Sequence, residues 1–320
     1  MAGELSLAPG RSVPQAGVLE ADMPAIYRAG GSVSAGAQKD HYSAHGWLLI
    51  LLMLGAVASA LSPAAELIAP GSASTVLLIQ RGLAILAAAT FAAGLWLTGL
   101  ARSEKWGAAW YDGRALAESA KSMAWKYMMR APPYDVLAGA DDLFCNDLSK
   151  LLVDTRLRGI PGVQPNDPGQ ITNRMRQVRG LPVADRLQIY LAARIDDQQA
   201  WYTRRSEDHG ASSRRWFRVT IGLSGTALLL AIVGVVWLPA NGVLGVVTTA
   251  GSCAVAWTQI HRYTELAHSY GFTSQEIGLL HPKSITATDE VLLARFVADC
   301  ETAFSREHAM WRARREIADG

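Results

Sequence analysis

Two long apolar stretches, each interrupted once by a short turn, constrain this chain more than any other feature of its sequence. In the first, the charge-free run 46–61 is followed by prolines and a glycine and then by the apolar run 75–100. In the second, the runs 219–238 and 243–260 flank a turn of sequence PANG. About 20 apolar residues cross the roughly 30 Å hydrocarbon core of a bilayer as an α-helix. The pattern therefore predicts two helical hairpins with four transmembrane spans.

The basic residues are distributed very unevenly around these hairpins. Of the 30 Lys and Arg residues, only Arg81 lies inside them, and neither connecting loop contains one. Loops rich in Lys and Arg remain in the cytoplasm. We therefore expect both connecting loops to lie outside the cell and the N-terminus, the middle of the chain and the C-terminus to lie inside.

Outside the spans the sequence is polar, and four spans occupy only about a quarter of 320 residues. The remainder is long enough to bury a helical core of its own. We expect residues 1–20 to form a disordered Gly- and Pro-rich tail that is not a signal peptide. The three cysteines show no metal-binding spacing and are expected to be reduced and unpaired.

The polar regions are typical of amphipathic helices. The second span is expected to continue inward as a stalk from Arg102 to Pro132, and 141–157 to form another helix. A helix beginning after Pro182 would run into the third span, with a kink or break expected near Gly210. A last amphipathic helix covers 289–318. The predicted fold class is all-α: a membrane bundle of four spans with long cytoplasmic helical extensions.

The fourth span carries small or polar residues at three- and four-residue steps. Small residues allow helices to approach closely, and hydroxyl groups can bond across helices. This row either packs within one subunit or faces a subunit interface or pore. The candidates for a lining or interface role in this span are Gly245, Thr249, Ser252, Ala256 and Gln259. Arg81 of the second span is a further candidate, either at the outer mouth of a pore or among the outer headgroups.

Basic residues precede the third span, where anionic lipid headgroups attract them by about 1 kcal/mol each. These headgroup candidates are Arg204, Arg205, Arg214, Arg215 and Arg218. Specific nucleic-acid binding is not expected. His261, Glu265 and His268 share a helix face, and this spacing is more typical of a solvated surface than of a metal site.

Signatures of catalysis are missing from the sequence. It contains no phosphate-binding GxxxxGK[ST] loop, no HExxH motif, no GxSxG elbow and no dinucleotide fingerprint. Ion-coupled transporters require ionisable residues at mid-depth in their spans. None lies at that depth in this sequence. We therefore expect neither an enzyme nor a cofactor, nor an ion-coupled pump.

Motifs beside the spans resemble those of a known family. The first hairpin is preceded by DMPAIYRAGGSVSAGAQKDHY and followed by WYDGRALAESAKSMAWKY. The second is preceded by RIDDQQAWYTRRSEDHG and followed by HRYTELAHSYGFTSQEI and ETAFSREHAMWRAR. In tandem these resemble two subtypes of the SLATT domain, a two-span bacterial module. The expected organisation is a tail (1–20), a first unit (21–158), a linker (159–181) and a second unit (182–320).

The resemblance implies a homo-oligomeric, pore-forming effector of the bacterial inner membrane that acts in abortive anti-phage defence. A nucleotide second messenger, or a SLOG or nucleotidyltransferase partner protein, would supply the cytoplasmic signal. The matching residues suggest ion pairs and aromatic contacts between stalk helices. They are Trp110, Arg114, Glu118, Lys121, Trp125, Arg194, Asp197, Gln198, Trp201, Tyr202, Glu301, Arg306, Glu307 and Trp311.

Two other functions remain open from the sequence. A membrane-anchored scaffold would use the stalk to recruit a separate effector and would never open a pore. A housekeeping ion channel would conduct without harming the cell that expresses it. Leakage from liposomes, with the trigger present, distinguishes the scaffold from the two conducting proteins.

Overall fold

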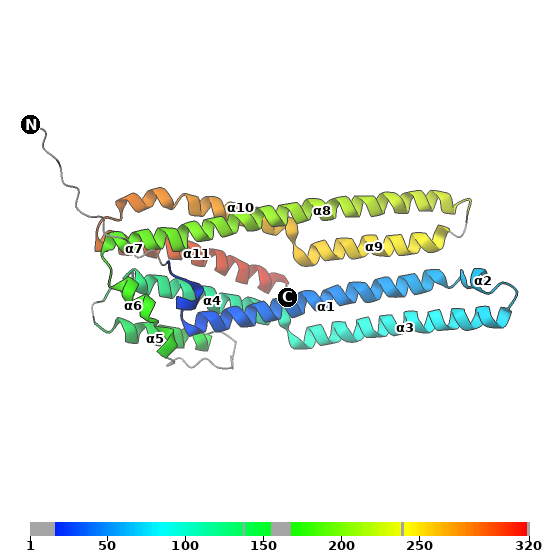
Figure 1. Ribbon diagram of the computed structural model, residues 1–320, viewed down its shortest axis with the longest axis horizontal. Helices are drawn as coiled ribbons and strands as arrows, with labels where there is room; N and C mark the ends of the chain where they lie inside the picture. The colour runs from blue at the N-terminus through cyan, green and yellow to red at the C-terminus, as the bar shows by residue number, and fades with distance from the viewer. Residues whose placement is uncertain (1–16, 137, 155–167, 238–239, 319–320) are drawn as a thin grey trace, which may run out of the picture. The chain divides into compact units, whose positions relative to one another are not determined.

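The chain forms a helical protein that divides into two compact units (Figure 1). The computed structural model describes residues 17–136, 138–154, 168–237 and 240–318, apart from the side chains of 67–68, 168, 240 and 306–318. The membrane unit comprises Val33–Tyr111 and Tyr202–Phe272. The polar unit comprises Met1–Ser32, Asp112–Trp201 and Thr273–Gly320. The described residues contain no β-strand, as the all-α prediction requires.

The membrane unit is built from two antiparallel helical hairpins. The first hairpin consists of α1 (Ala25–Leu61), the short α2 (Ala65–Ile68) and α3 (Ala73–Glu104). The second consists of α8 (Asp197–Gly234) and α9 (Ala240–His261). Each of these four long helices belongs to a helical stretch that is long and apolar enough to cross a membrane, which confirms the four predicted spans.

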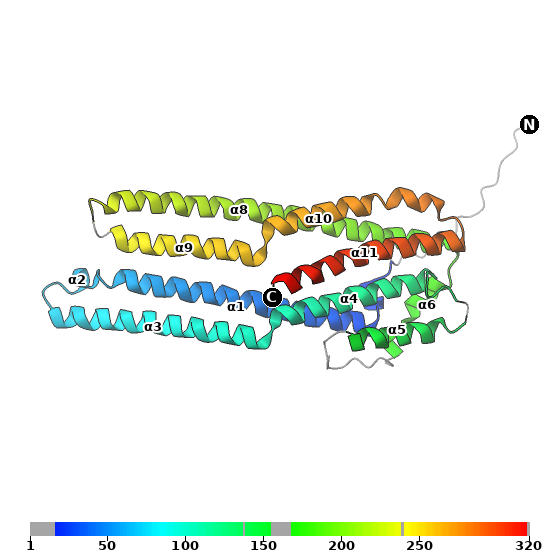
Figure 2. The same cartoon turned by 180° about the vertical axis from the view of Figure 1, so that it is seen from behind.

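Small residues set the contacts between these helices. A side chain at Gly55 of α1 would collide with Thr90 of α3, whose Oγ1 lies 2.9 Å from the position that a β-carbon would take. On the opposite side of α1, a β-carbon at Gly242 of α9 would lie 3.4 Å from the Ala60 carbonyl oxygen. The same atom at Gly251 of α9 would lie 3.9 Å from Leu223 of α8. The helices therefore lie in the order α3, α1, α9, α8, as both views show (Figure 2).

The polar unit collects the remaining elements around the polar ends of α1 and α8. Its elements are η1 (Glu20–Asp22), most of α4 (Trp106–Met128), α5 (Ala140–Asp154), η2 (Pro168–Gln170), α6 (Asn173–Arg179), α7 (Val183–Tyr190), the π-helical turn η3 (Leu191–Asp196), the end of α10 (Tyr263–Gly278), η4 (His281–Thr286) and α11 (Glu290–Ala318). The Thr172 hydroxyl caps α6 by accepting a hydrogen bond from the Met175 amide, and it donates one to the Asp22 carbonyl. This cap ties α6 to the turn that precedes α1.

Two sequence predictions about helix continuity are wrong. Gly210 keeps helical geometry and lies inside the unbroken helix α8. A β-carbon there would meet only the Arg214 side chain of the same helix, at 3.4 Å. The second span does not continue into its stalk without interruption, since Lys105 adopts a left-handed conformation (φ 51°) between α3 and α4. The helix α5 confirms the amphipathic helix predicted over 141–157 up to Asp154.

The regions at the chain ends and between the repeats are only partly described. Most of the predicted disordered tail, 1–16, lies outside the described residues, as does 155–167 at the start of the predicted linker. From Pro168 onward the linker contains η2 and α6. The backbone of α11 continues to Ala318, but the predicted stalk residues Arg306, Glu307 and Trp311 lie outside the described side chains.

Candidate functional site

A buried ion pair occupies the centre of the polar unit. The Arg194 guanidinium donates from Nε to Oε1 of Glu301 at 2.9 Å and from Nη2 to Oε2 at 2.8 Å. The two side chains are 2% and 0% exposed. Glu301 lies on α11, whereas Arg194 lies on the π-helical turn η3, a type of turn that is frequent at functional sites. Two charges this deeply buried persist only because their geometry is bidentate and further hydrogen bonds satisfy them.

Aromatic groups complete the surroundings of this pair. The Tyr190 hydroxyl donates to Oε1 of Glu301 at 2.9 Å, and the Arg194 guanidinium lies 4.5 Å from the centre of the Phe304 ring. Tyr190 also meets Trp125 of α4 edge to face, with ring centres 5.6 Å apart. Burial, reinforced by the Glu301 charge, raises the pKa of Tyr190 well above its usual value. The phenol therefore remains a hydrogen-bond donor at every physiological pH.

Two donors in this core have no hydrogen-bond partner among the described residues. They are Nη1 of Arg194 and Nε1 of Trp125, both buried. An unpaired buried donor costs about 1–3 kcal/mol. The bidentate ion pair is therefore accompanied by two buried donors that lack an acceptor.

Lys121 of α4 adds a second cation to the same region. Its ammonium group lies 6.0 Å from the centre of the Tyr27 ring. Burial lowers the pKa of Lys121, and the nearby Arg194 lowers it further, while Glu118 acts in the opposite direction. Elsewhere on α4, the Arg114 guanidinium lies 5.8 Å from the centre of the Trp201 ring. Through Arg114, α4 therefore contacts an element of the second repeat.

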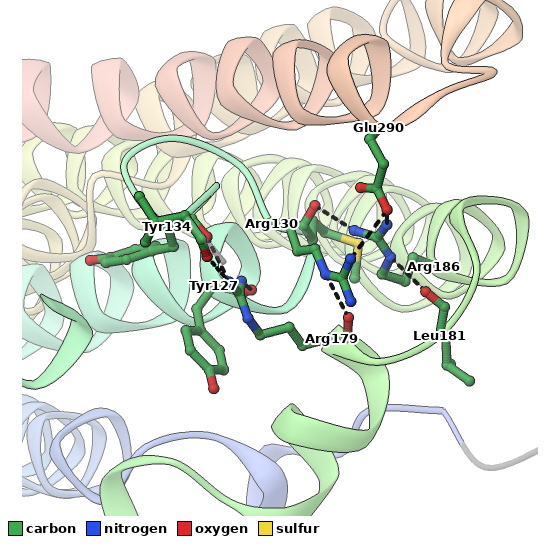
Figure 3. Close-up of polar contacts among 9 residues, drawn as sticks. Tyr127, Arg130, Tyr134, Arg179, Leu181, Arg186 and Glu290 are labelled. Atoms are coloured by element: carbon green, nitrogen blue, oxygen red, sulfur yellow. Dashed lines mark hydrogen bonds and ion pairs between the residues drawn. The ribbon is translucent and has the colours of Figure 1, made fainter. Parts of the chain in front are cut away.

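A second polar network fixes the far end of α4 (Figure 3). Arg186, whose side chain is fully buried, donates from Nε to the Leu181 carbonyl at 3.0 Å and from Nη1 to the Met129 carbonyl at 2.9 Å. Its Nη2 pairs with Glu290, the first residue of α11, which also lies 3.4 Å from Nη1 of Arg130. One carboxylate thus connects α11 to the ends of α4 and α7.

Arg179 of α6 closes the turn that follows α4. It donates from Nη1 to the Tyr127 carbonyl at 2.6 Å and from Nη2 to the Tyr134 carbonyl at 2.9 Å (Figure 3). Burial lowers the pKa of Arg179, but its carbonyl partners need a donor and not a particular charge. Arg179 and Arg186 therefore supply side-chain donors to two carbonyl groups at the end of α4, those of Tyr127 and Met129.

The row of small and polar residues on the fourth span is partly exposed in the membrane unit. Gly245, Ser252 and Gln259 are exposed, and a β-carbon at Gly245 would meet nothing within 4 Å. Thr249 and Ala256 are half-buried, and Thr249 donates back to the Gly245 carbonyl at 2.8 Å. Packing inside one subunit therefore does not account for the exposed members of the row.

The remaining predicted residues separate into three groups. Trp110 and Tyr202 belong to the membrane unit and do not join the buried ion pair, although Trp110 contacts Tyr42 and Tyr202 contacts Tyr270 there. Asp197 is exposed and Gln198 half-buried near the start of α8. The predicted headgroup residues lie exposed along α8; they are Arg204, Arg205, Arg214, Arg215 and Arg218. Arg81 is exposed on α3.

Sequence reasoning missed several residues that organise both units. Arg186 and Glu290 form the second network, and Tyr42 stacks on His261, named above only as a surface residue, with ring centres 4.2 Å apart in the membrane unit. An arginine on an amphipathic helix usually faces solvent, so its burial has no local signal. An aromatic residue next to the start of a span, as Tyr42 is, resembles an ordinary interface anchor.

The chain matches two family models over most of its length. Residues 24–187 match "SMODS and SLOG-associating 2TM effector domain 3", and residues 190–311 match "SMODS and SLOG-associating 2TM effector domain 1". No curated protein and no solved structure matches it. With two helical hairpins, each joined to polar helices, and a family match for each repeat, the chain belongs to the SMODS and SLOG-associating two-transmembrane (SLATT) effector family as a tandem of two such domains.

Proposed function

We propose that this protein is a homo-oligomeric effector that permeabilises the bacterial inner membrane when its polar unit receives a signal. The observation that carries the proposal is the exposed face of α9. Among its described residues, the only large apolar side chains exposed on it are Val243 and Val255. The exposed positions between them are small or polar, including Gly245, Thr248 and Ser252.

The other three spans present a different surface. Leu54 of α1 is 51% exposed, Leu95 of α3 is 76% exposed and Leu229 of α8 is 65% exposed. Such side chains suit contact with lipid tails. The α9 face lacks them, and its small residues suit close helix approach or contact with water. In a ring of subunits, α9 would line the interface or the lumen.

The polar unit supports a role in signalling rather than catalysis. Its buried ion pair and arginine network join α4 of the first repeat to α7, η3 and α11 of the second. A nucleotide second messenger or a SLOG- or nucleotidyltransferase-type protein, as the family context suggests, would act by favouring one packing of these helices. A ligand shifts such an equilibrium only through different affinities for the two states.

The orientation and lipid contacts are part of the same proposal. With both connecting loops free of Lys and Arg, the polar unit and both chain ends lie in the cytoplasm. The exposed arginines of α8, including Arg214 and Arg218, then meet anionic headgroups just below the third span. Halting an infected cell by leakage would be the outcome in abortive infection.

Liposomes containing the purified protein and an encapsulated dye test the proposal. Thr248→Leu and Ser252→Leu together should reduce induced leakage at least tenfold. The matched control is Thr226→Leu, because Thr226 is also exposed and also donates to a carbonyl of its own helix. Equal loss in the control and the double variant would show that α9 is not the lining.

The same assay addresses the two other functions. No leakage with any candidate trigger, combined with capture of a partner by the polar unit, would support a scaffold and refute the pore. Leakage without a trigger, and growth unaffected by expression, would support a housekeeping channel.

A further inference from the structure

An open hollow lies on α8 where this helix passes from its polar end into the third span. Its volume is about 450 Å³, and the described residues that line it are Ser213, Arg214, Phe217 and Arg218. Clefts that bind small molecules measure roughly 300–1,000 Å³. The apolar run of the third span begins at Val219, so the hollow lies at the boundary between the polar and the apolar part of the helix.

Two guanidinium groups line this hollow without an acidic partner among the described residues. Arg214 and Arg218 are both exposed. Nε of Arg218 donates to the Arg214 carbonyl at 3.4 Å. Nη1 of Arg214 lies 3.4 Å from the position that a β-carbon of Gly210 would take, one turn closer to the polar end of α8. Both side chains therefore extend away from the span, as arginines do when they keep their charge among headgroups.

An exposed apolar strip continues from the hollow along α8. Phe217 is 67% exposed, Ile221 57% and Leu228 63%. Steps of four and seven residues place these side chains on one face of the helix. On the same face a β-carbon at Gly225 would meet nothing within 4 Å, which leaves room beside the strip. Arg214 precedes Phe217 by three residues and therefore stands at the polar end of this strip.

We infer that the hollow binds the phosphate of one anionic phospholipid, with Arg214 and Arg218 on the phosphate oxygens and an acyl chain along Phe217 and Ile221. Guanidinium groups form strong, charge-assisted hydrogen bonds to phosphate. A soluble phosphate compound would use the two arginines and leave the apolar strip uncovered, whereas a phospholipid satisfies both features. The inference rests on the proposed function for its membrane setting, and it assigns a discrete lipid site within it.

A discrete site differs from diffuse attraction of basic residues to the membrane. The helix α8 carries five arginines, and only Arg214 and Arg218 line the hollow. Arg215 is exposed and directly follows Arg214, but it is not among the lining residues. Diffuse attraction depends on charge and depth, so Arg214 and Arg215 would then contribute about equally. In a discrete site Arg214 contributes more.

Native mass spectrometry of the full-length protein in a non-ionic detergent tests the inference by counting bound lipids. The probes are phosphatidylglycerol, which carries a net negative charge, and phosphatidylcholine with the same acyl chains, which is neutral overall. An uncharged micelle has no surface potential, so only groups that contact or closely approach the lipid contribute. The first phosphatidylglycerol should bind at least about fivefold more tightly than the first phosphatidylcholine, the effect of one arginine near a headgroup.

Arg214→Gln should weaken binding of the first phosphatidylglycerol about fivefold, and Arg214→Gln combined with Arg218→Gln about 25-fold, at about fivefold per arginine. Arg215→Gln is the matched control, since it removes the same charge one residue away. In about 0.15 M salt, which screens charges that do not touch the lipid, it should change the affinity by at most about twofold. Equal losses in Arg214→Gln and Arg215→Gln would overturn the discrete site in favour of diffuse attraction.

Phe217→Ala examines the contact with the acyl chain. It should weaken phosphatidylglycerol and phosphatidylcholine by the same factor, because the two lipids have the same chains and Phe217 carries no charge. Phe217→Leu retains an apolar side chain and should keep most of the affinity. Unchanged binding of both lipids to Phe217→Ala would refute the proposed path of the chain.

Glycerol phosphate, which has the phosphate but no acyl chain, distinguishes the two sources of phosphate. It should not displace phosphatidylglycerol at comparable concentration. Displacement would overturn the lipid as the occupant and assign the hollow to a soluble phosphate compound. Because these measurements need neither a trigger nor a pore, failure of the leakage assay would leave the lipid site standing, and failure to bind lipid would leave the proposed pore untouched.

Discussion

The two units of this protein bury opposite kinds of side chain. The largest fully buried side chains that the structure describes all lie in the polar unit, among them Trp125, Arg186 and Arg194. The spans bury small residues at their contacts, such as Ala58 and Thr90, and expose large apolar ones.

The difference follows from the solvent that each unit requires. In water, large apolar surfaces are driven inward, and a charge can be buried only with a partner. In lipid, no such force acts between helices, and packing of small residues brings them together. The polar unit should therefore be most sensitive to loss of a charge partner, and the membrane unit to gain of bulk.

Glu301→Ala should have the largest effect on stability, because it leaves Arg194 buried without its carboxylate. Loss of one partner of a buried ion pair costs about 3–5 kcal/mol. Denaturant titration in detergent, followed by tryptophan fluorescence, measures the change. Asp299→Ala is the control, since Asp299 is exposed on the same helix and should cost less than about 0.5 kcal/mol. A Glu301→Ala cost as small as the control would break the comparison.

Gly55→Leu should destabilise the membrane unit by about 1–3 kcal/mol, since the added side chain must displace Thr90 and Phe91. Reversible unfolding in mixed micelles is the appropriate measurement. The same substitution at Gly225 of α8, where a β-carbon meets nothing within 4 Å, serves as the control and should be nearly neutral. Equal costs at the two positions would mean that small residues do not set the helix contacts.

Glu290→Gln should have a smaller effect, about 1 kcal/mol, because the carboxylate is half exposed and water can replace part of its interaction. The variant removes the charge shared by Arg186 and Arg130. Hydrogen exchange should show faster opening of the first turn of α11. Glu276→Gln, an exposed glutamate on α10, should show no change; a matching change there would remove the assigned role of Glu290.

The smallest expected effect is a dependence of stability on acid pH through Asp141. Burial alone would raise the pKa of this carboxyl, but hydrogen bonds from Tyr127 and Arg176 outweigh it and hold the pKa below its usual value. The stabilisation is therefore present above the ordinary pKa of an aspartate and is lost as pH falls through the lower value in the folded protein. Asp141→Asn should flatten the stability profile in that acid range; an unchanged profile would contradict the assignment.

The family resemblance and the four spans could be predicted from the sequence because both rest on local patterns. Runs of apolar residues, the charges beside them and the motifs that flank the spans are properties of short segments. The pairing of Arg194 with Glu301 could not be predicted, because 107 positions separate them and either could have faced solvent.

The two wrong predictions share one cause, which is that both relied on the local helix preference of single residues. Gly210 is a weak helix former, yet α8 continues through it from Asp197 to Gly234. Lys105 is a good helix former, yet it adopts a left-handed bend between α3 and α4. Intrinsic preferences of about 1 kcal/mol are readily outweighed by contacts with distant residues.

The sequence by itself determined that this chain is helical, has four spans and contains two repeats, since hydrophobic length and helical periodicity act along a single segment. Only the tertiary structure decided which charges are buried, which face of α9 stays open, and where a left-handed residue interrupts the helix after the second span of each hairpin. Those features depend on the free energy of bringing distant segments together. No single segment encodes that energy.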